Sequence, residues 1–550
     1  MEKDNLTSEE LLCIEVEEQF KRLQYERKAI EHGWELNMNF VKGNQYCTVA
    51  AGGIAQLDKT YDWEQRRVFN HIAPVIDTRL SKLSRIRPAL AVRAASDDEE
   101  DKQAAELAVA ILSAVQEECD LDGVISEATM WSEICGTAFY KIMWNSNGGR
   151  QVGATEDGGA VKDGSVKICA VSPFEIYPSS LTEENLENQT ALIHAKILPV
   201  ESIADAYGVE LVGRDMSEFR QPCAGFKSDA GDNKVYTGSK FELVLERYMR
   251  TSSAYPEGRL TVVAGGKLLY DGALPYINGA DGMRCYPFVK QISMPSAGNF
   301  FGSSVVERLI PLQRAYNAVK NRRHEYLNRI SMGTVAVEDG SVDVEELADG
   351  GLAPGKVIIY RQGGTPPEML TLGNVPDEFW KEEESLLSEF TKISGTGDLS
   401  ENADSFAGIT SATGLQLILE QDDARLNTTY QSLKRAVKNI GRQILRLYRQ
   451  FATDVRLMRY AGKDGGSKLI FFKGSDISGD DVVLDADTDL NMTPAQKKAA
   501  IYEMMDRGLF LDENGRMSAR AKKKILETLG YASFTDVIPE DSAKGDINDD

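Results

Sequence analysis

The chain has 550 residues, of which 42% are apolar and 27% are charged, and this balance predicts an ordered protein of several domains rather than a disordered or fibrous one. Its 62 Lys and Arg residues against 85 Asp and Glu residues give a net charge of −23, which argues against a protein that grips nucleic acid over its whole surface. The seven cysteines form no CxxC pair, no apolar run is long enough to span a membrane, and the N-terminus lacks the pattern of a signal peptide. We therefore expect an acidic, soluble, intracellular protein without disulfides or a zinc site.

Motifs for catalysis are weak. The four histidines, His32, His71, His194 and His324, lie far apart in the sequence, and no GxSxG motif is present. The segment 350–356, GGLAPGK, has the spacing of a phosphate-binding loop, but Val357 follows where the loop needs Ser or Thr. The following VIIY pattern predicts a strand rather than a helix, so we expect a turn that leads into a strand. The sequence thus predicts no catalytic residue, no metal site and no cofactor.

The first half of the chain changes from helical to β-rich. Apolar residues recur at helical spacing through the first fifty positions, and further helices are expected after Pro74, over 97–118 and over 122–135. An extended segment is expected at 89–94. After Gly136 the pattern predicts strands around 139–144, 166–171, 190–197, 240–250, 259–264 and 267–270, with a short helix near 200–207.

In the middle of the chain, the spacing of apolar residues and the charges predict a basic helix over 301–331, a β-rich insert over 332–376 and an acidic helix over 377–394. The basic residues of the first helix are Arg308, Arg314, Lys320, Arg322, Arg323 and Arg329, and the second carries Glu382, Glu383, Glu384 and Glu389. This order suggests a helical hairpin whose charged faces pair with each other or with neighbouring copies. Two unrelated solvated helices remain the alternative.

A glycine-rich segment follows over 395–410, and no Lys or Arg occurs between Lys392 and Arg425. It leads into the longest predicted helix, 411–453, which at 1.5 Å per residue would be roughly 60 Å long. Strands are expected at 468–473 and 482–485, helices at about 494–507 and 518–529, and an acidic tail at the end.

Several stretches, taken in this order, resemble the portal (head-to-tail connector) proteins of tailed double-stranded DNA phages. They are FNHIAP at 69–74 with SRIRP at 84–88, VSPFEIYP at 171–178, YPFV at 286–289, and FGSSVVE at 301–307 followed by Gln313 and Asn317. The resemblance implies an α+β portal fold of wing, stem, clip and crown that assembles as a ring of twelve subunits around a channel. No helical barrel is expected after the crown.

The resemblance also implies a division of the chain. Residues 1–300 would be wing, helical over 1–136 and β-rich over 137–300; 301–331 and 377–394 would be the stem helices. The clip would be 332–376, the tunnel loop 395–410, the spine helix of the wing 411–453, and the crown with the acidic tail 454–550.

The implied sites follow from this division. The DNA-facing tunnel loop would present Gly395, Gly397, Asp398, Glu401, Asn402, Asp404, Ser405 and Phe406, and the docking residues of the clip would be Glu338, Asp339, Glu345, Glu346, Asp349 and Arg361. The stem charges would either bridge neighbouring subunits or form rings that contact phosphates, and we favour the bridges. A channel through which DNA slides should not hold the polyanion tightly, which suits a loop without cations.

The implied partners are the large terminase subunit, head-completion or tail adaptor proteins, the major capsid and scaffolding proteins, and double-stranded DNA without sequence specificity. The protein would lie at one vertex of the virion and in the host cytoplasm during assembly, without a membrane. Two other hypotheses remain at this stage. One is a nuclease or packaging ATPase, which would need an intact phosphate loop or a convergent set of carboxylates on strands; the other is an adaptor or minor capsid protein that conducts no DNA.

Overall fold

The computed structural model describes most of the chain. It covers residues 7–50, 53–59, 61, 64–84, 90–94, 96, 98–154, 160–214, 240–279, 281–332, 334–345, 357–370, 375–395, 412–461, 467–477, 479–484, 501–502, 504–505, 507, 517, 522 and 525. Statements about the structure below concern these residues.

The described residues form an α+β protein. Its α-helices are α1 (Ser8–Lys42), α2 (Ile72–Ser84), α3 (Glu99–Glu118), α4 (Leu121–Cys135), α5 (Val200–Tyr207), α6 (Val305–Met332), α8 (Glu378–Ser394) and α10 (Ala412–Phe451). Short 3-10 helices are η2 (Pro173–Glu175), η3 (Leu186–Asn188) and η5 (Gly474–Asp476).

All strand pairs are antiparallel, and two sheets lie in the body. One has the order β12 (Lys267–Gly272), β11 (Arg259–Ala264), β10 (Phe241–Met249), β9 (Ala191–Pro199), β8 (Ile176–Pro178). The other has the order β13 (Phe288–Ile292), β4 (Thr137–Asn145), β7 (Ser165–Val171). Two-stranded pairs join β1 (Cys47–Ala50) to β2 (Gly53–Gln56), β5 (Gln151–Ala154) to β6 (Ala160–Lys162), β14 (Thr334–Ala336) to β15 (Glu368–Leu370), β16 (Arg456–Ala461) to β17 (Ser467–Phe472), and β18 (Val482–Leu484) to β3 (Leu90–Val92).

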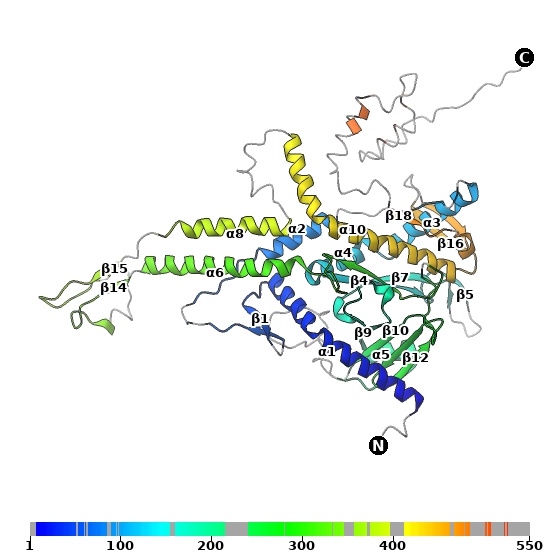
Figure 1. The fold of residues 1–550 in the computed structure, drawn as a ribbon, viewed down its shortest axis with the longest axis horizontal. Coiled ribbons are helices and arrows are strands. Elements are labelled where there is room, and N and C mark those ends of the chain that lie inside the picture. Colours follow the sequence, from blue (N-terminus) through cyan, green and yellow to red (C-terminus); the bar gives the residue numbers. More distant parts are fainter. Residues whose placement is uncertain are drawn as a thin grey trace, which may run out of the picture.

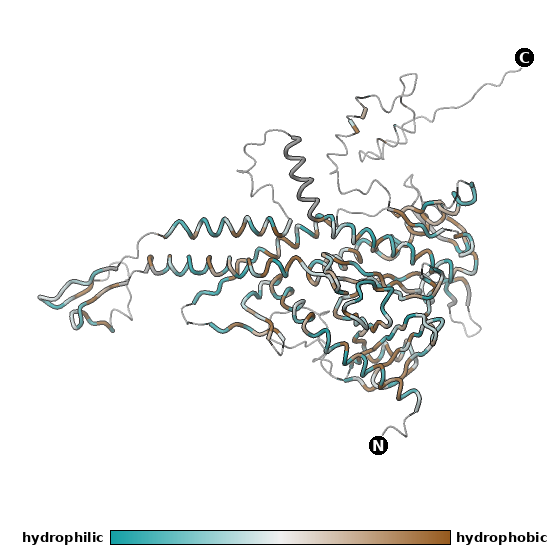
Figure 2. Tube along the Cα trace, viewed as in Figure 1, coloured by the Kyte–Doolittle hydropathy of each residue, from teal (hydrophilic) through white to brown (hydrophobic). Residues whose placement is uncertain are grey.

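One feature dominates the shape: α6 and α8 lie side by side and project from the body, with β14 and β15 at the far tip (Figure 1). We call these two helices and the insert 333–377 between them the arm. Hydrophobic and hydrophilic residues alternate along both helices (Figure 2), as expected for helices that share one apolar seam.

The arm is rooted in a buried apolar cluster. Phe40 of α1, Ile76 of α2, Leu309 of α6 and Phe390 of α8 all belong to it and are at most 4% exposed. Because four helices contribute to one core, the base of the arm is fixed to the body while its tip is not covered by other described elements (Figure 1).

The region predicted as crown contacts the region predicted as wing. Strand β18 pairs with β3, β16 packs against α3, and α10 packs against both β13 and β18. A second apolar cluster holds these elements together around Val437, Ile440 and Tyr448 of α10. The described residues of 454–484 are therefore joined to the N-terminal half of the chain.

Most predicted elements occur close to their expected positions, but the strand expected from the VIIY pattern does not. Residues 357–361 carry no strand, and Val357 and Ile359 are 82% and 84% exposed. The pattern reflects the β preference of Val and Ile, yet a strand also needs a partner strand, and none of the described strands pairs with residues 357–360. The lysine of GGLAPGK, Lys356, lies outside the described residues, as do most positions of the two C-terminal helices expected at 494–507 and 518–529.

The segment FGSSVVE packs tightly where the arm leaves the body. A Cβ atom on Gly302 would lie 2.3 Å from Cγ2 of Ile292 and 2.7 Å from the carbonyl oxygen of Met294. A Cβ on Gly136, whose φ is +84°, would lie 2.3 Å from the carbonyl oxygen of Gly302. Only glycine allows the two backbones to cross this closely.

We expect Gly302→Ala to lower the free energy of unfolding by about 1–3 kcal/mol, because the added methyl group forces the backbones apart. Urea denaturation followed by circular dichroism measures the change. Gly33→Ala is the matched control, since Gly33 lies inside α1 and a Cβ added there would meet no atom within 4 Å. An equal loss in both variants would contradict the close-approach explanation.

Candidate functional site

The arm begins at a capped helix end. The Ser304 hydroxyl accepts the backbone N–H of Val306 at 3.0 Å and donates to the carbonyl oxygen of Glu133 at 2.6 Å. It therefore caps the start of α6 and ties it to α4. Where the chain returns to the body, α8 ends at Gly395, which has a left-handed φ of +67° and whose N–H bonds to the carbonyl of Thr391.

A buried charge cluster joins the two helices. The Glu383 carboxylate accepts from Lys320 Nζ at 2.9 Å and from Arg323 at 2.8 Å. The side chains of Glu383 and Arg323 are each 7% exposed, and that of Lys320 is 19% exposed. The Arg323 guanidinium also lies 3.9 Å from the centre of the Trp380 ring. Thus two of the predicted basic residues and one predicted acid pair within a single chain.

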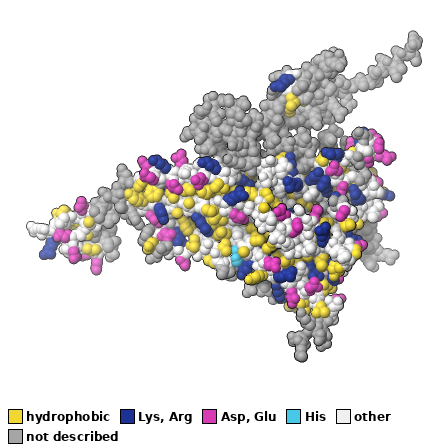
Figure 3. All heavy atoms as spheres, in the orientation of Figure 1, with side chains coloured by type: hydrophobic (Ala, Val, Ile, Leu, Met, Phe, Trp, Pro, Cys, Tyr) yellow, Lys and Arg dark blue, Asp and Glu magenta, His cyan; other side chains and the backbone are white. Residues whose placement is uncertain are grey.

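The other predicted stem charges whose side chains the structure describes are exposed. Arg308, Arg314 and Arg322 of α6 and Glu382, Glu384 and Glu389 of α8 are exposed; the side chain of Arg329 lies outside the described ones. Arg314 still donates to the carbonyl oxygen of Cys47 at 2.9 Å. Side chains of both charge signs line the outer surface of the arm, and hydrophobic side chains gather between its helices (Figure 3). The arm therefore has an internal charge cluster and separate external charges.

A ladder of side chains on α6 holds an extended segment of the chain, and sequence reasoning missed it. Gln313, Asn317, Asn321 and Glu325 accept the backbone N–H groups of His71, Phe69, Arg67 and Gln65, in that order, at 2.9 to 3.1 Å. Gln313 and Asn321 also donate to the carbonyl oxygens of Phe69 and Arg67.

The ladder forms because the spacing of residues along the helix matches the spacing along the extended segment. Four helical residues rise about 6 Å, which is close to the roughly 6.6 Å spanned by two extended residues. Every fourth residue of the helix can therefore bond to every second residue of the extended segment. The signal in the sequence is the recurrence of Gln313, Asn317 and Asn321 every four residues along the helix. It also gives Gln313 and Asn317, which belong to the resemblance with portal proteins, a structural role.

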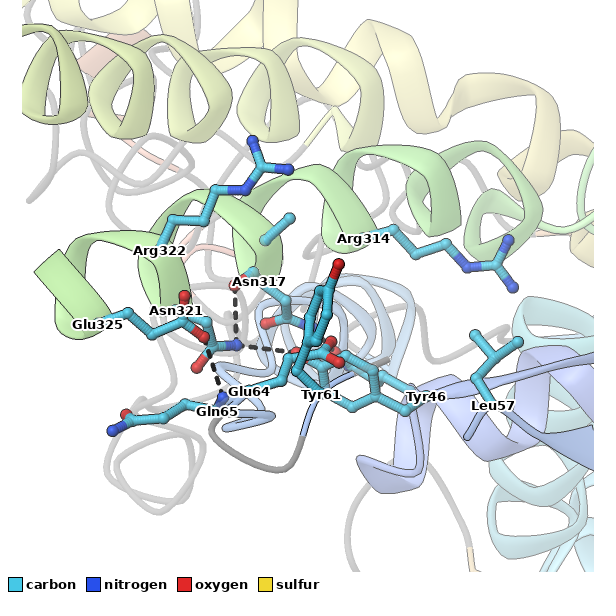
Figure 4. Close-up of a pocket in the computed structure, with 12 residues that line it drawn as sticks. Tyr46, Leu57, Tyr61, Glu64, Gln65, Arg314, Asn317, Asn321, Arg322 and Glu325 are labelled. Carbon is cyan, nitrogen blue, oxygen red and sulfur yellow. Dashed lines mark hydrogen bonds between the residues drawn. The ribbon is translucent and has the colours of Figure 1, made fainter. Parts of the chain in front are cut away.

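A cavity of about 420 Å³ lies beside this ladder, between α6 and the residues Leu57, Tyr61, Glu64 and Gln65 (Figure 4). Tyr46 and Tyr61 line it from one side, and Arg314 and Arg322 line it from α6. Nearby, burial and the cations Arg67, Arg323 and Lys320 lower the pKa of His324, whose ring stacks on Phe69. Among the residues that the structure describes, no cluster of His, Cys, Asp and Glu could hold a metal ion.

The tip of the arm carries several residues of the predicted clip site. The Glu338 carboxylate accepts the N–H of Thr365 at 2.6 Å, and this bond lowers the pKa of Glu338. Asp339, Glu345 and Arg361 are exposed, and the Arg361 N–H bonds to the carbonyl of Ser341. Glu346 and Asp349 lie outside the described residues.

The predicted tunnel loop is represented only by its first residue. Gly395 closes α8 in the left-handed conformation. The remaining predicted positions, Gly397, Asp398, Glu401, Asn402, Asp404, Ser405 and Phe406, lie outside the described residues. In the portion of the chain that the structure covers, no helix is long and apolar enough to cross a membrane.

Comparison with known proteins gives one family. Residues 255–464 match the family model described as Phage SU10 portal protein. The matched region contains α6, α8 and α10, and thus the whole arm and the long helix that follows it. A search of curated proteins gives no match. This region carries the most distinctive architecture of the molecule, and through it the chain is similar to phage portal proteins.

Proposed function

We propose that this chain is the subunit of a dodecameric ring at one vertex of a phage capsid, where the ring forms the channel through which DNA enters and leaves. The observation that carries the proposal is the family match over 255–464, because it covers the arm and the long helix together. In this role the chain acts as a structural conduit, and a separate motor supplies the energy for packaging.

The arm would be the stem of the ring, with its tip as the clip. Its internal cluster, Glu383 with Lys320 and Arg323, would keep each stem hairpin rigid. The external charges would then be available to neighbouring subunits. Arg308 and Arg322, about four turns apart on α6, lie on one side of that helix, and Glu382 and Glu389 lie on one side of α8.

We favour pairing of these exposed arginines with the exposed glutamates of an adjacent copy over contact with DNA phosphates. The reason is charge complementarity: a basic and an acidic helix on every subunit supply both halves of the same contact around a closed ring. A lining of arginines would instead hold the DNA backbone and oppose sliding.

The tip would dock the large terminase subunit during packaging and head-completion or tail adaptor proteins afterwards. It presents three exposed charged residues, Asp339, Glu345 and Arg361. Val357 and Ile359 add exposed apolar surface close to these charges in sequence. Such a mixture of apolar and charged groups is suited to partners that exchange.

The mass and shape of the purified protein test the proposal. Light scattering with negative-stain images of the same peak should give a particle of about twelve subunits with a central hole wide enough for a DNA duplex of roughly 20 Å. A monomer that remains monomeric at high concentration and in the presence of scaffolding protein would contradict the ring. A compact dimer that responds to nucleotide would favour an enzyme instead.

Shortening the segment between α8 and α10 separates assembly from DNA handling. We expect removal of residues 397–407 to leave the ring intact and to reduce DNA packaging or retention roughly tenfold or more, because this segment is the proposed DNA-facing element of the channel. Gly395 is kept, since it ends α8. Packaging of DNA into procapsids, measured as nuclease-protected DNA, gives the result. Loss of ring formation would count against the channel assignment.

A further inference from the structure

A buried ion pair lies where the arm meets the body. Arg79 of α2 donates to Oε2 of Glu133, on α4, at 2.5 Å. The Arg79 side chain is 5% exposed and that of Glu133 is fully buried. A charged pair that is removed from water to this extent is costly unless both partners have further hydrogen bonds. Both Arg79 and Glu133 form further hydrogen bonds of this kind.

The second bond of Arg79 reaches the end of α8. Its Nη1 donates to the carbonyl oxygen of Ser394 at 2.8 Å, and Ser394 is 1% exposed. The last carbonyl groups of a helix have no partner within the helix and carry partial negative charge. A guanidinium can satisfy one of them and bind a carboxylate at the same time, since its donors form a rigid fork.

The second carboxylate oxygen of Glu133 reaches toward α10. It accepts from the Ser293 hydroxyl at 2.7 Å, and the carbonyl of Ser293 accepts from the Thr429 hydroxyl of α10 at 2.9 Å. The backbone carbonyl of Glu133 holds Ser304 at the start of α6. One buried carboxylate thus lies at the point where both arm helices and α10 meet.

We propose that Arg79 and Glu133 form a joint that fixes the last turn of α8 to the body and thereby sets where the chain leaves α8 toward α10. In this joint Arg79 and Glu133 are positioning residues. The significance for DNA handling rests on the proposed function, because the segment between the two helices is the proposed channel loop. The joint itself rests only on the contacts above.

The variant Arg79→Lys tests the joint. A lysine keeps the charge and can still pair with Glu133, but its compact ammonium cannot span the carboxylate and the Ser394 carbonyl as a fork does. We expect amide hydrogen exchange at residues 391–395 to accelerate roughly tenfold in the full-length protein. Exchange at the start of α6 should stay unchanged, because Ser304 binds a backbone carbonyl that the substitution leaves in place.

Arg446→Lys is the matched control. Arg446 also spans a carboxylate and a carbonyl, those of Asp480 at 2.5 Å and Asn278 at 2.6 Å, but it lies toward the other end of α10. It should leave exchange at 391–395 as in the wild type. Equal exchange at these amides in the wild type and Arg79→Lys, or the same acceleration in both lysine variants, would overturn the joint.

The wild-type protein alone supplies a second measurement should Arg79→Lys fail to fold. With the joint, amides 391–395 should exchange at least tenfold more slowly than those near the tip end of α6, at 326–330. Equal exchange at the two sites would overturn the proposal.

These readouts do not depend on ring formation: faster exchange in Arg79→Lys with no ring from the wild type would sustain the joint and reject the proposed function. If the wild type forms a ring and exchange is unchanged in Arg79→Lys, the joint is rejected and the proposed function is sustained.

Discussion

Replacing Glu383 with alanine is expected to lower the free energy of unfolding by about 3–5 kcal/mol, the usual cost of removing one partner from a buried charge pair. Glu383 is the shared acceptor of Lys320 and Arg323, and the substitution leaves two cations in the seam between α6 and α8. Arg323, 7% exposed, cannot turn its charge to solvent without losing its contact with Trp380. Chemical denaturation measures the loss, and hydrogen exchange should locate it in the arm.

The neighbouring residue provides the control. Glu384 is exposed and follows Glu383 directly in α8, so Glu384→Ala should change the free energy of unfolding by no more than about 0.5 kcal/mol. Similar losses in the two variants would show that the acidic character of α8, and not the shared acceptor, stabilises the arm.

Two variants with reversed charges on the exposed surface of the arm are expected to fail to assemble when each is alone. A mixture of the two is expected to assemble. The first variant carries Arg308→Glu and Arg322→Glu, and the second carries Glu382→Lys and Glu389→Lys. Each alone places like charges at the proposed contact between copies, which should raise the concentration for half-assembly tenfold or more. In an equimolar mixture, the reversed α6 of one variant meets the reversed α8 of the other at alternate contacts.

Sedimentation at low and high salt gives the result. Defects in the single variants should shrink at high salt, because exposed charges are screened. Normal assembly of both variants, together with a loss of DNA affinity in the arginine variant alone, would favour phosphate contact over contact between copies. A variant with Asp339→Lys and Glu345→Lys, at the tip, changes the net charge by +4, as the second variant does, and controls for that change.

The elements of this protein were largely predictable because their signals are local. The apolar stripe of 301–331 predicts α6, and the start of that helix needs only Ser304 as a cap. The opposite charges of 301–331 and 377–394 predict a hairpin, and the structure places the two helices side by side. The prediction of a strand at 357–360 was wrong for a related reason: local β preference gives no information about the presence of a partner strand.

Which charges pair could not be read from the sequence. All six basic residues of 301–331 look alike in composition, yet only Lys320 and Arg323 are seen to reach Glu383 among the described side chains, because the angular position around α6 decides which side chains face α8. The ladder of Gln313, Asn317 and Asn321 was visible only as a repeat of amides. Its partner, the backbone of 65–71, is more than 240 residues away.

The order of elements, the charge of each arm helix and the resemblance to portal proteins can all be read from the amino-acid sequence, since each depends on residues close together along the chain. The contacts of Arg79 with both Glu133 and the end of α8, and the close approach of Gly302 to Gly136, become visible only in the folded chain. The physical reason is that a buried polar group takes whichever partner the packing brings within about 3 Å, and that distance is set by apolar cores built from distant segments of the chain.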